Sequence, residues 1–206
     1  HGNLDQVITV GRDAANTGES SVGLQVGETF TLRDLIKAAL IKSANDACVA
    51  IAEGVAGSQS RFVHLMNVKA QQLGCRDTHF ANPHGLHNPN HYTSAHDLAV
   101  IARAALKIPL INQVVDTKTT SIHGNAKIGP RRVLVNRNKL LFRWGQCNGM
   151  KTGYTREAGN CLVATATELD PVTRAPWRLL SVVMKTKSGT SWPQSRELVQ
   201  SQGFDA

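Results

Sequence analysis

Apolar residues in the first third of the chain follow a short extended stretch and then recur at the spacing of helices. Residues 7–10 read as a strand, and the glycine- and serine-rich residues 18–27 predict a loop. Thr31 opens a stretch that resembles a capping box, and the apolar positions after it predict a helix as far as about Lys42. These residues therefore predict a strand, a loop and a helix in succession.

A short polar stretch, Ser43-Ala44-Asn45-Asp46, interrupts this helical pattern. Ser, Asn and Asp side chains compete for backbone hydrogen bonds and favour helix ends over helix interiors. Residues 47–55 then resume the pattern as an almost wholly apolar helix, which Gly57 closes. The stretch is thus predicted to form a junction between two helices, one of them buried.

Two further helices are predicted before the composition changes. Residues 60–73 form the first, with Gly74 as its C-cap, and the second begins at Thr93 or Ser94 and ends at Pro109. Between them, residues 82–90 are rich in turn formers and predict a long loop. The inward-facing positions are expected to be Phe62, Leu65, Met66 and Leu73 in the first helix and Leu98, Ile101, Ala102, Ala105 and Leu106 in the second.

The second half of the chain has the composition of strands. Residues 117–135, with glycines at Gly124 and Gly129, predict short strands and turns. Three longer strands are expected at residues 148–155, 161–166 and 178–184, with a turn at residues 156–160 and a closing helix at residues 195–202. Short connections favour an antiparallel sheet. The chain is therefore expected to be a single α+β domain spanning residues 1–206, with a helical lobe and an antiparallel sheet.

Composition and charge narrow the range of functions only slightly. Of the 206 residues 41% are hydrophobic, which is enough for a core, and no run of 18 apolar residues predicts a membrane span. The net charge of +8 fits either a generic basic surface or attraction to an acidic polymer or membrane surface. Nucleic-acid binding is disfavoured, because aromatic residues make up only 5% of the chain and the basic residues are scattered. The four cysteines show no CxxC pair, so their spacing predicts no metal site and leaves the question of disulfides open.

Two short motifs, Ser43-Ala44-Asn45 and Lys151-Thr152-Gly153, carry the candidate chemistry. Together they supply two hydroxyls, a carboxamide, an ammonium and a bare backbone, which suit the binding of a peptide carboxylate and the stabilisation of an acyl transfer. The second motif lies in the strand expected at residues 148–155, where a glycine often marks the close approach of a ligand or another backbone. Each motif alone is weak, because it also reads as a helix junction or an exposed strand end. Both in this order, each on its expected element, are far more specific.

The segments around these motifs resemble the D-alanyl-D-alanine carboxypeptidases, low-molecular-mass penicillin-binding proteins of the S11 serine peptidase family. In penicillin-binding enzymes such motifs accompany a third, S-x-x-K, which holds the nucleophilic serine. No serine of this chain is followed by lysine three positions later. The resemblance runs from about Leu4 to Phe204 and is carried by residues 23–28, 34–47, 82–86, 91–93, Ala95, 97–99, 138–141 and 149–161.

The resemblance implies a penicillin-binding-protein/β-lactamase-like transpeptidase fold and a serine acyl-enzyme mechanism. A serine would attack the peptide bond before the terminal D-alanine of a peptidoglycan stem pentapeptide, and water would then hydrolyse the acyl-enzyme. β-Lactams would act as inhibitors, and no cofactor or metal is implied. The protein would work in the bacterial cell envelope, in the periplasm or at the outer face of the cytoplasmic membrane.

The same resemblance implies that Ser43, Asn45 and Lys151 are catalytic residues. Ser43 would relay protons near the S-x-x-K lysine, which would be the general base for the serine. Asn45 would hydrogen-bond the peptide amide of the substrate. Lys151 would supply positive charge next to the reacting groups.

Substrate binding is assigned by the resemblance to Lys151, Thr152, Gly153 and Tyr154. Thr152 would bind the terminal carboxylate, and Gly153 would leave room for the substrate backbone. The backbone N–H of Tyr154 would be one oxyanion donor, while the other would belong to the nucleophilic serine.

Where the chain departs from the family pattern, we expect missing segments. Family members carry S-x-x-K on a helix upstream of the point that matches residues 1–4, so the nucleophile and its lysine are expected to lie outside this chain. The chain alone would then be inactive and, with apolar surface exposed, either unstable or held by a partner segment. Many relatives continue into a small β-rich domain and an amphipathic membrane anchor, which these 206 residues lack, and membrane-surface association would depend on such segments. A basic residue that often precedes the last helix in the family is left unassigned.

Two other functions remain compatible with the sequence. The first is a non-catalytic module that binds peptidoglycan or a partner on the same fold, and its complete coding sequence would lack S-x-x-K. The second is a β-lactamase relative. The long resemblance to carboxypeptidase segments argues against that second function, as does the absence from this chain of a plausible deacylating glutamate loop.

Five histidines lie close together in the sequence, at positions 79, 84, 87, 91 and 96. Histidine clusters bind zinc when carboxylates or cysteines complete a suitable spacing. Neither residue type completes one here, so turn hydrogen bonds and loop packing are the expected role.

Overall fold

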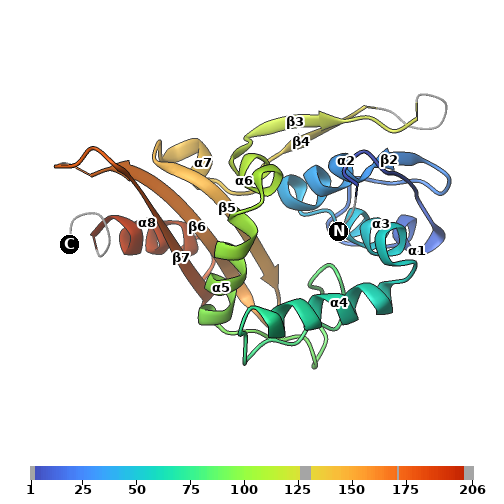
Figure 1. The fold of residues 1–206 in the computed structure, drawn as a ribbon, viewed down its shortest axis with the longest axis horizontal. Coiled ribbons are helices and arrows are strands. Elements are labelled where there is room, and N and C mark those ends of the chain that lie inside the picture. Colours follow the sequence, from blue (N-terminus) through green and yellow to red (C-terminus); the bar gives the residue numbers. More distant parts are fainter. Residues whose placement is uncertain (1–2, 126–130, 171, 202–206) are drawn as a thin grey trace. The chain divides into compact units, whose positions relative to one another are not determined.

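Helices and short strand pairs form one part of the fold, and a three-stranded sheet with its helices forms the other (Figure 1). The computed structural model describes residues 3–125, 131–170 and 172–201. The first unit comprises the residues up to Gln72 together with Thr78–Tyr92 and Thr117–Asn136. The second comprises Leu73–Asp77, Thr93–Asp116 and the residues from Arg137 onward.

The first unit combines two antiparallel strand pairs with a group of helices. The strand pairs are β1 (Val7–Thr9) with β2 (Thr29–Thr31) and β3 (Thr119–Ile122) with β4 (Arg132–Val135). The helices are α1 (Arg12–Ala15), α2 (Leu32–Lys37), the π-helix η1 (Ala38–Lys42), α3 (Asn45–Ala56) and α4 (Gln59–Gln72). The capping role predicted for Thr31 is confirmed, because its hydroxyl accepts from the backbone N–H of Asp34 at 3.2 Å.

Small buried residues let α3 pack closely against its neighbours. Ala47, Ala50 and Ala52 are fully buried. A Cβ added at Gly54 would meet the side chain of Ile8 in β1 at 2.6–2.8 Å, so only glycine permits this approach of helix to strand. Gly57 then ends the helix with a left-handed φ of 77°, as the sequence predicts.

The second unit is built on the antiparallel sheet of β5 (Cys147–Thr155), β6 (Gly159–Leu169) and β7 (Pro176–Thr186), in that order. Its helices are α5 (Ala95–Leu106), α6 (Pro109–Asp116), α7 (Leu140–Arg143) and α8 (Ser191–Val199). None of the described helices alone is long and apolar enough to cross a membrane, and only α5 and α6 together, bent by 107°, reach that length and apolarity. The core under α7 and α8 consists of Leu140, Leu141, Trp144, Cys147, Leu162, Ala164, Ala166, Val183 and Val199.

The predicted α+β class and the antiparallel sheet are confirmed, but the helices around the sheet differ from the prediction. Pro109 does not end the fourth helix; α5 stops at Leu106 and Pro109 begins the unpredicted α6. Proline suits the first turn of a helix, because its missing N–H would have no partner there. The short α7 was not predicted either, and the closing helix begins at Ser191 instead of residue 195. Gly129 and Gln202 lie outside the described residues.

The inner face predicted for α4 is partly wrong. Leu65 is 53% exposed, and Ala70 is the only described residue of α4 that is fully buried. α4 packs mainly against one neighbour, α3. An apolar stripe at helical spacing shows which face can be buried, but the neighbouring elements decide how much of it is covered.

A buried ion pair joins distant parts of the first unit. Arg132 of β4 contacts Glu28 at 2.7 Å, and the two side chains are only 9% and 0% exposed. Arg132 also donates to the carbonyls of Val22 (2.9 Å) and Gly23 (2.7 Å), and it lies over the ring of Phe30. These hydrogen bonds offset the cost of taking both charges out of water.

Replacing Arg132 by methionine should destabilise the protein strongly. Glu28 would remain buried without its partner, and breaking one half of a buried pair typically costs about 3–5 kcal/mol. The matched control is Arg131→Met at the neighbouring exposed position, expected to change the free energy of unfolding by less than about 0.5 kcal/mol. Urea unfolding of both variants measures the difference, and equal stabilities would contradict the role given to the pair.

Candidate functional site

The junction at Ser43-Ala44-Asn45 has an unusual backbone. Ser43 adopts the left-handed conformation (φ 61°, ψ 43°), which is unfavourable for most residues other than glycine. Ala44 is extended, and α3 begins at Asn45. The N–H of Ala44 donates to the carbonyl of Ala38, six residues earlier, at 3.2 Å. π-Turns and strained backbone recur at functional sites. The predicted interruption between two helices is therefore confirmed, and its geometry marks it as a candidate site.

Asn45 is held by a segment that precedes it by more than 20 residues in the sequence. Its backbone N–H donates to the carbonyl of Ser20 at 2.7 Å, and its side-chain Nδ2 donates to the carbonyl of Gly18 at 3.2 Å. The side chain is nearly buried, with 6% of the residue exposed. The hydrogen bond to Gly18 therefore orients the carboxamide of Asn45.

Asp46, the residue after the motif, is fully buried and was not assigned a role from the sequence. Its carboxylate accepts from the hydroxyl of Ser21 (2.6 Å) and from the backbone N–H groups of Val22 (3.1 Å), Leu24 (3.0 Å) and Ala47 (2.9 Å). A carboxylate in the first turn of a helix is also favoured by the helix dipole. Its position directly after the motif was the available signal.

The Lys151–Tyr154 motif belongs to the second unit and lies in β5, as predicted. Lys151 pairs with Val163, Thr152 with Leu162 and Gly153 with Cys161 of β6. β5 forms one edge of the sheet in the described part of the chain. Lys151 Nζ donates to the carbonyl of Thr152 at 2.7 Å, and Tyr154 is 69% exposed. An edge strand with accessible residues can accept an extended peptide alongside it.

The two glycines of β5 have different reasons to be glycine. At Gly149, φ is 150° and a Cβ would meet the side chains of Thr165 at 3.0 Å and Val115 at 3.1 Å. At Gly153, φ is not in the left-handed region, and a Cβ would meet nothing closer than Cys161 at 3.7 Å, an ordinary contact. Packing within the protein therefore requires Gly149 but not Gly153. An exposed glycine that packing does not require is consistent with space kept for a ligand.

Two side chains that the sequence analysis left unassigned fix the start of β5. Buried Asn138 donates from Nδ2 to the carbonyl of Gly149 at 2.8 Å and accepts from the N–H of Leu140 at 3.1 Å. Arg178 of β7 donates to the carbonyl of Asn148 at 3.3 Å. Sequence pattern alone cannot show which polar residues become buried, because the signal is the three-dimensional pairing itself.

Cys147, the first residue of β5, is not a candidate nucleophile. Burial raises the pKa of its thiol, although hydrogen bonds with Gly149 and Asn138 act in the opposite direction. The reactive form of cysteine is the thiolate. A buried, protonated thiol in the core has instead the role of a small apolar side chain.

Histidines in the loop after α4 accept backbone hydrogen bonds, as predicted for turn packing. Nδ1 of His91 accepts from the N–H of Ala81, and Nδ1 of His84 accepts from the N–H of Leu86, both at 3.2 Å. Burial lowers the pKa of both rings. The charge of His91 lowers the pKa of His84 further, while Glu19 raises it in part. The charge of His79 lowers the pKa of His91 further. Within the described residues, no three His, Cys, Asp or Glu side chains come together as a metal site would need.

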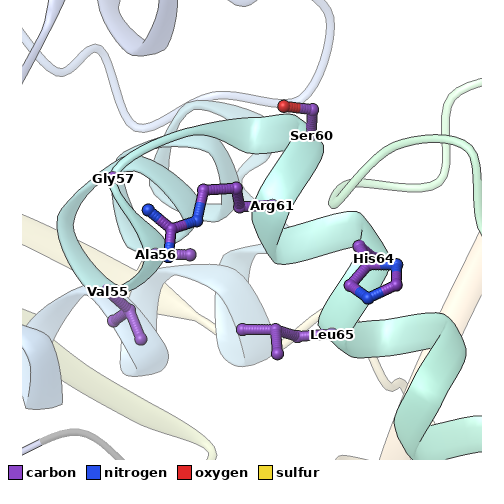
Figure 2. A pocket seen from close by; sticks show the side chains of 7 residues that line it. All are labelled: Val55, Ala56, Gly57, Ser60, Arg61, His64 and Leu65. Atoms are coloured by element: carbon purple, nitrogen blue, oxygen red, sulfur yellow. The ribbon is translucent and has the colours of Figure 1, made fainter.

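A surface pocket of about 650 Å³ lies between the end of α3 and the start of α4 (Figure 2). Figure 2 shows Arg61 extending from α4 toward Ala56 at the end of α3. The pocket is lined by Val55, Ala56, Gly57, Ser60, Arg61, His64 and Leu65. None of the motif residues contributes to it, so its shape adds nothing to the chemistry of the motifs.

Comparison with known proteins finds a family match that includes both motifs. The sequence matches the Peptidase_S11 family, described as D-alanyl-D-alanine carboxypeptidase, over residues 3–188. It is 37% identical to D-alanyl-D-alanine carboxypeptidase DacF of Bacillus subtilis (strain 168), covering 94% of this chain and 46% of that protein. It is also 37% identical to DacC of Escherichia coli (strain K12), covering 98% of this chain and 49% of that protein. The chain therefore spans about half the length of these relatives.

Solved structures share the fold. D-alanyl-D-alanine carboxypeptidase DacD from Francisella tularensis has a TM-score of 0.83 at 30% identity, covering 96% of this chain and 58% of that one. The Streptomyces K15 DD-transpeptidase has a TM-score of 0.88 at 28% identity, covering 99% of this chain and 80% of that one. These likenesses confirm the transpeptidase-type fold expected from the sequence.

Alanine at the two glycines of β5 should separate a packing requirement from an open position. Gly149→Ala should lower the free energy of unfolding by about 1–3 kcal/mol, because it adds both backbone strain and close contacts. Gly153→Ala should change it by less than about 0.5 kcal/mol. Urea unfolding measures both, and equal losses for the two variants would contradict the distinction.

In the folded protein, the rings of His84 and His91 should have pKa values below the ordinary histidine pKa of 6.5. Because the pKa of each ring is lower in the folded state, the unfolded state binds more protons as the pH falls. The contribution of these rings to the free energy of unfolding is therefore complete above pH 6.5, and it is lost as the pH falls through their pKa values in the folded state. NMR titration of the ring protons of His84 and His91 measures the pKa values directly. The double variant His84→Asn/His91→Asn should flatten the loss of stability below pH 6.5, and pKa values at or above 6.5 would contradict the assignment.

Proposed function

Because the chain belongs to the Peptidase_S11 family of D-alanyl-D-alanine carboxypeptidases, we propose that it is the part of such an enzyme that binds the substrate and stabilises its reaction. The substrate is a peptidoglycan stem peptide ending in D-Ala-D-Ala, and the reaction removes the terminal D-alanine. β-Lactams, which imitate that terminus, inhibit it, and the protein works in the bacterial cell envelope. The observation that carries the proposal is the family match over residues 3–188, which includes both motifs.

In this proposal the edge strand β5 binds the end of the substrate. The hydroxyl of Thr152 donates to the terminal carboxylate, and the ammonium of Lys151 adds positive charge where negative charge resides or develops. The missing side chain of Gly153 leaves room for the peptide backbone. The backbone N–H of Tyr154 donates to the oxyanion of the tetrahedral intermediate, a contribution typically worth about 3–4 kcal/mol of barrier.

The junction before α3 supplies the remaining groups. The carboxamide of Asn45 hydrogen-bonds the peptide amide of the substrate, and the hydroxyl of Ser43 relays protons to and from the lysine of S-x-x-K. The orientation of the Asn45 carboxamide by Gly18 supports this role, because a side chain that is already ordered loses little conformational entropy when substrate binds.

The chemistry also requires a serine nucleophile. Its oxygen attacks the carbonyl carbon before the terminal D-alanine, an ester forms, and D-alanine leaves with the proton that the lysine took from the serine. Water then attacks the ester and restores the serine. No S-x-x-K occurs in the 206 residues, so the test of activity uses the complete gene product beside this chain.

Penicillin acylation, measured as intact mass, tests the proposal and its rival. An adduct equal to the whole mass of the penicillin is expected on the complete gene product and not on the 206-residue chain alone. If neither forms an adduct, the enzyme proposal fails and the alternative applies, a non-catalytic module that binds peptidoglycan or a partner on the same fold. An adduct on this chain alone would contradict the assignment of the nucleophile to S-x-x-K.

Thr152→Val should slow penicillin acylation of the complete gene product by about 10- to 150-fold. The reason is the loss of a hydrogen bond to a carboxylate, which is typically worth about 1.5–3 kcal/mol. Thr119→Val makes the same change at an exposed position of β3 and should leave the rate unchanged. Stopped-flow or mass-spectrometric kinetics measure both rates, and similar rates for the two variants would remove Thr152 from the binding machinery.

A further inference from the structure

We infer that Asp46 is a positioning residue for Asn45, acting through residues 18–24, and this inference rests on the proposed role of Asn45. The two neighbours at the start of α3 contact the same segment. Asn45 donates to the carbonyls of Gly18 and Ser20, and Asp46 accepts from Ser21, Val22 and Leu24. The carbonyls that orient Asn45 and the N–H groups that bind Asp46 therefore belong to one short stretch of backbone.

This stretch has no regular secondary structure that could fix it. Residues 18–24 form neither helix nor strand, and Glu19 and Gly23 have positive φ values of 64° and 70°. A backbone outside helices and sheets keeps one conformation only where other groups satisfy its N–H and C=O groups. The fully buried Asp46 carboxylate satisfies two of these N–H groups and the Ser21 hydroxyl, and Arg132 binds the carbonyls of Val22 and Gly23.

The orientation of the Asn45 carboxamide depends on the same stretch. A carbonyl oxygen accepts only from N–H, so the contact with the Gly18 carbonyl requires Nδ2 on that side and turns Oδ1 away from it. If the carbonyl of Gly18 moves, no other side-chain hydrogen bond of Asn45 within the described residues distinguishes its two amide orientations. A flipped carboxamide would exchange the donor and acceptor that it presents to the peptide amide of the substrate.

Asp46→Asn should weaken the hydrogen bonds that hold residues 18–24, with little change in side-chain volume. An amide cannot accept from Ser21, Val22, Leu24 and Ala47 as a carboxylate does, because one of its two ends is a donor. Stability will fall, as for any loss of a buried, hydrogen-bonded carboxylate. Stability alone therefore cannot test a positioning role, and the decisive readouts are the carboxamide of Asn45 and the coupling of the two positions.

The first readout is independent of activity. The exchange of the Asn45 carboxamide protons with solvent is measured by NMR in the complete gene product. Their signals are assigned as those that are missing from the spectrum of Asn45→Ala. Asp46→Asn should accelerate this exchange on the order of tenfold or more, because the bond to Gly18 is weakened. The control Asp34→Asn, on α2 in the same unit, should leave the exchange unchanged. Unchanged exchange in Asp46→Asn would overturn the inference.

The second readout is a double-mutant cycle of penicillin acylation rates in the complete gene product. If Asp46 acts through Asn45, Asp46→Asn slows acylation in the wild-type background but not in the Asn45→Ala background. Independent, multiplying effects would contradict the inference. If the wild type is not acylated at all, the proposed function fails, while the exchange measurement still decides the positioning role.

A milder variant covers the case in which Asp46→Asn does not fold. Ser21→Ala removes only the hydroxyl that donates to Oδ2 of Asp46 at 2.6 Å. It should accelerate exchange of the Asn45 carboxamide in the same direction by a smaller factor. No acceleration in a folded Ser21→Ala protein would count against the transmission through this segment.

Discussion

Two buried carboxylates, Asp46 and Glu28, hold a segment of chain that has no helix or strand of its own. The clearest case is Val22, whose N–H donates to Asp46 and whose carbonyl accepts from Arg132, the ion-pair partner of Glu28. Burying a charge is costly unless hydrogen bonds and opposite charges compensate for it, and here both carboxylates have several partners. The conformation of the Ser43–Asn45 junction depends on this segment, because its carbonyls bind Asn45.

The second unit achieves fixed geometry by different means. β5 pairs with β6 from Gly149 to Thr155 after a register shift that follows Cys147, and Asn138, Val115 and Thr165 surround the backbone at Gly149. The motif that follows is by contrast accessible, with Gly153 and Tyr154 exposed. A strand with a fixed start and an accessible end suits the binding of an extended ligand, because the protein loses little conformational entropy when the ligand binds.

The sequence predicted the elements whose signals are local. The cap at Thr31, the ends of α3 and α4 at Gly57 and Gly74, and the three strands of the sheet follow from turn formers, caps and apolar periodicity. The elements that carry the two motifs, a helix junction and a strand of the sheet, were also predicted from the sequence. Pro109 shows the limit of such rules, since proline can end one helix or begin the next.

The buried polar contacts could not be predicted. Glu28 and Arg132 are 104 residues apart in the sequence, and neither position has a pattern that distinguishes it from a surface charge. Asp46 resembled one more cap-forming residue at a helix junction, and Asn138 was assigned no structural role from the sequence. In each case the meaning comes from partners that only the folded chain brings within hydrogen-bond distance.

The most direct test of this account is a crystal structure of the complete gene product acylated by a penicillin with an amide side chain. The account predicts that the carboxamide of Asn45 hydrogen-bonds the side-chain amide of the ligand at about 2.9 Å, while Nδ2 keeps its bond to the carbonyl of Gly18. An Asn45 carboxamide that is turned away from the ligand, or that has left Gly18 to reach it, would contradict the claim that residues 18–24 hold this group ready for substrate.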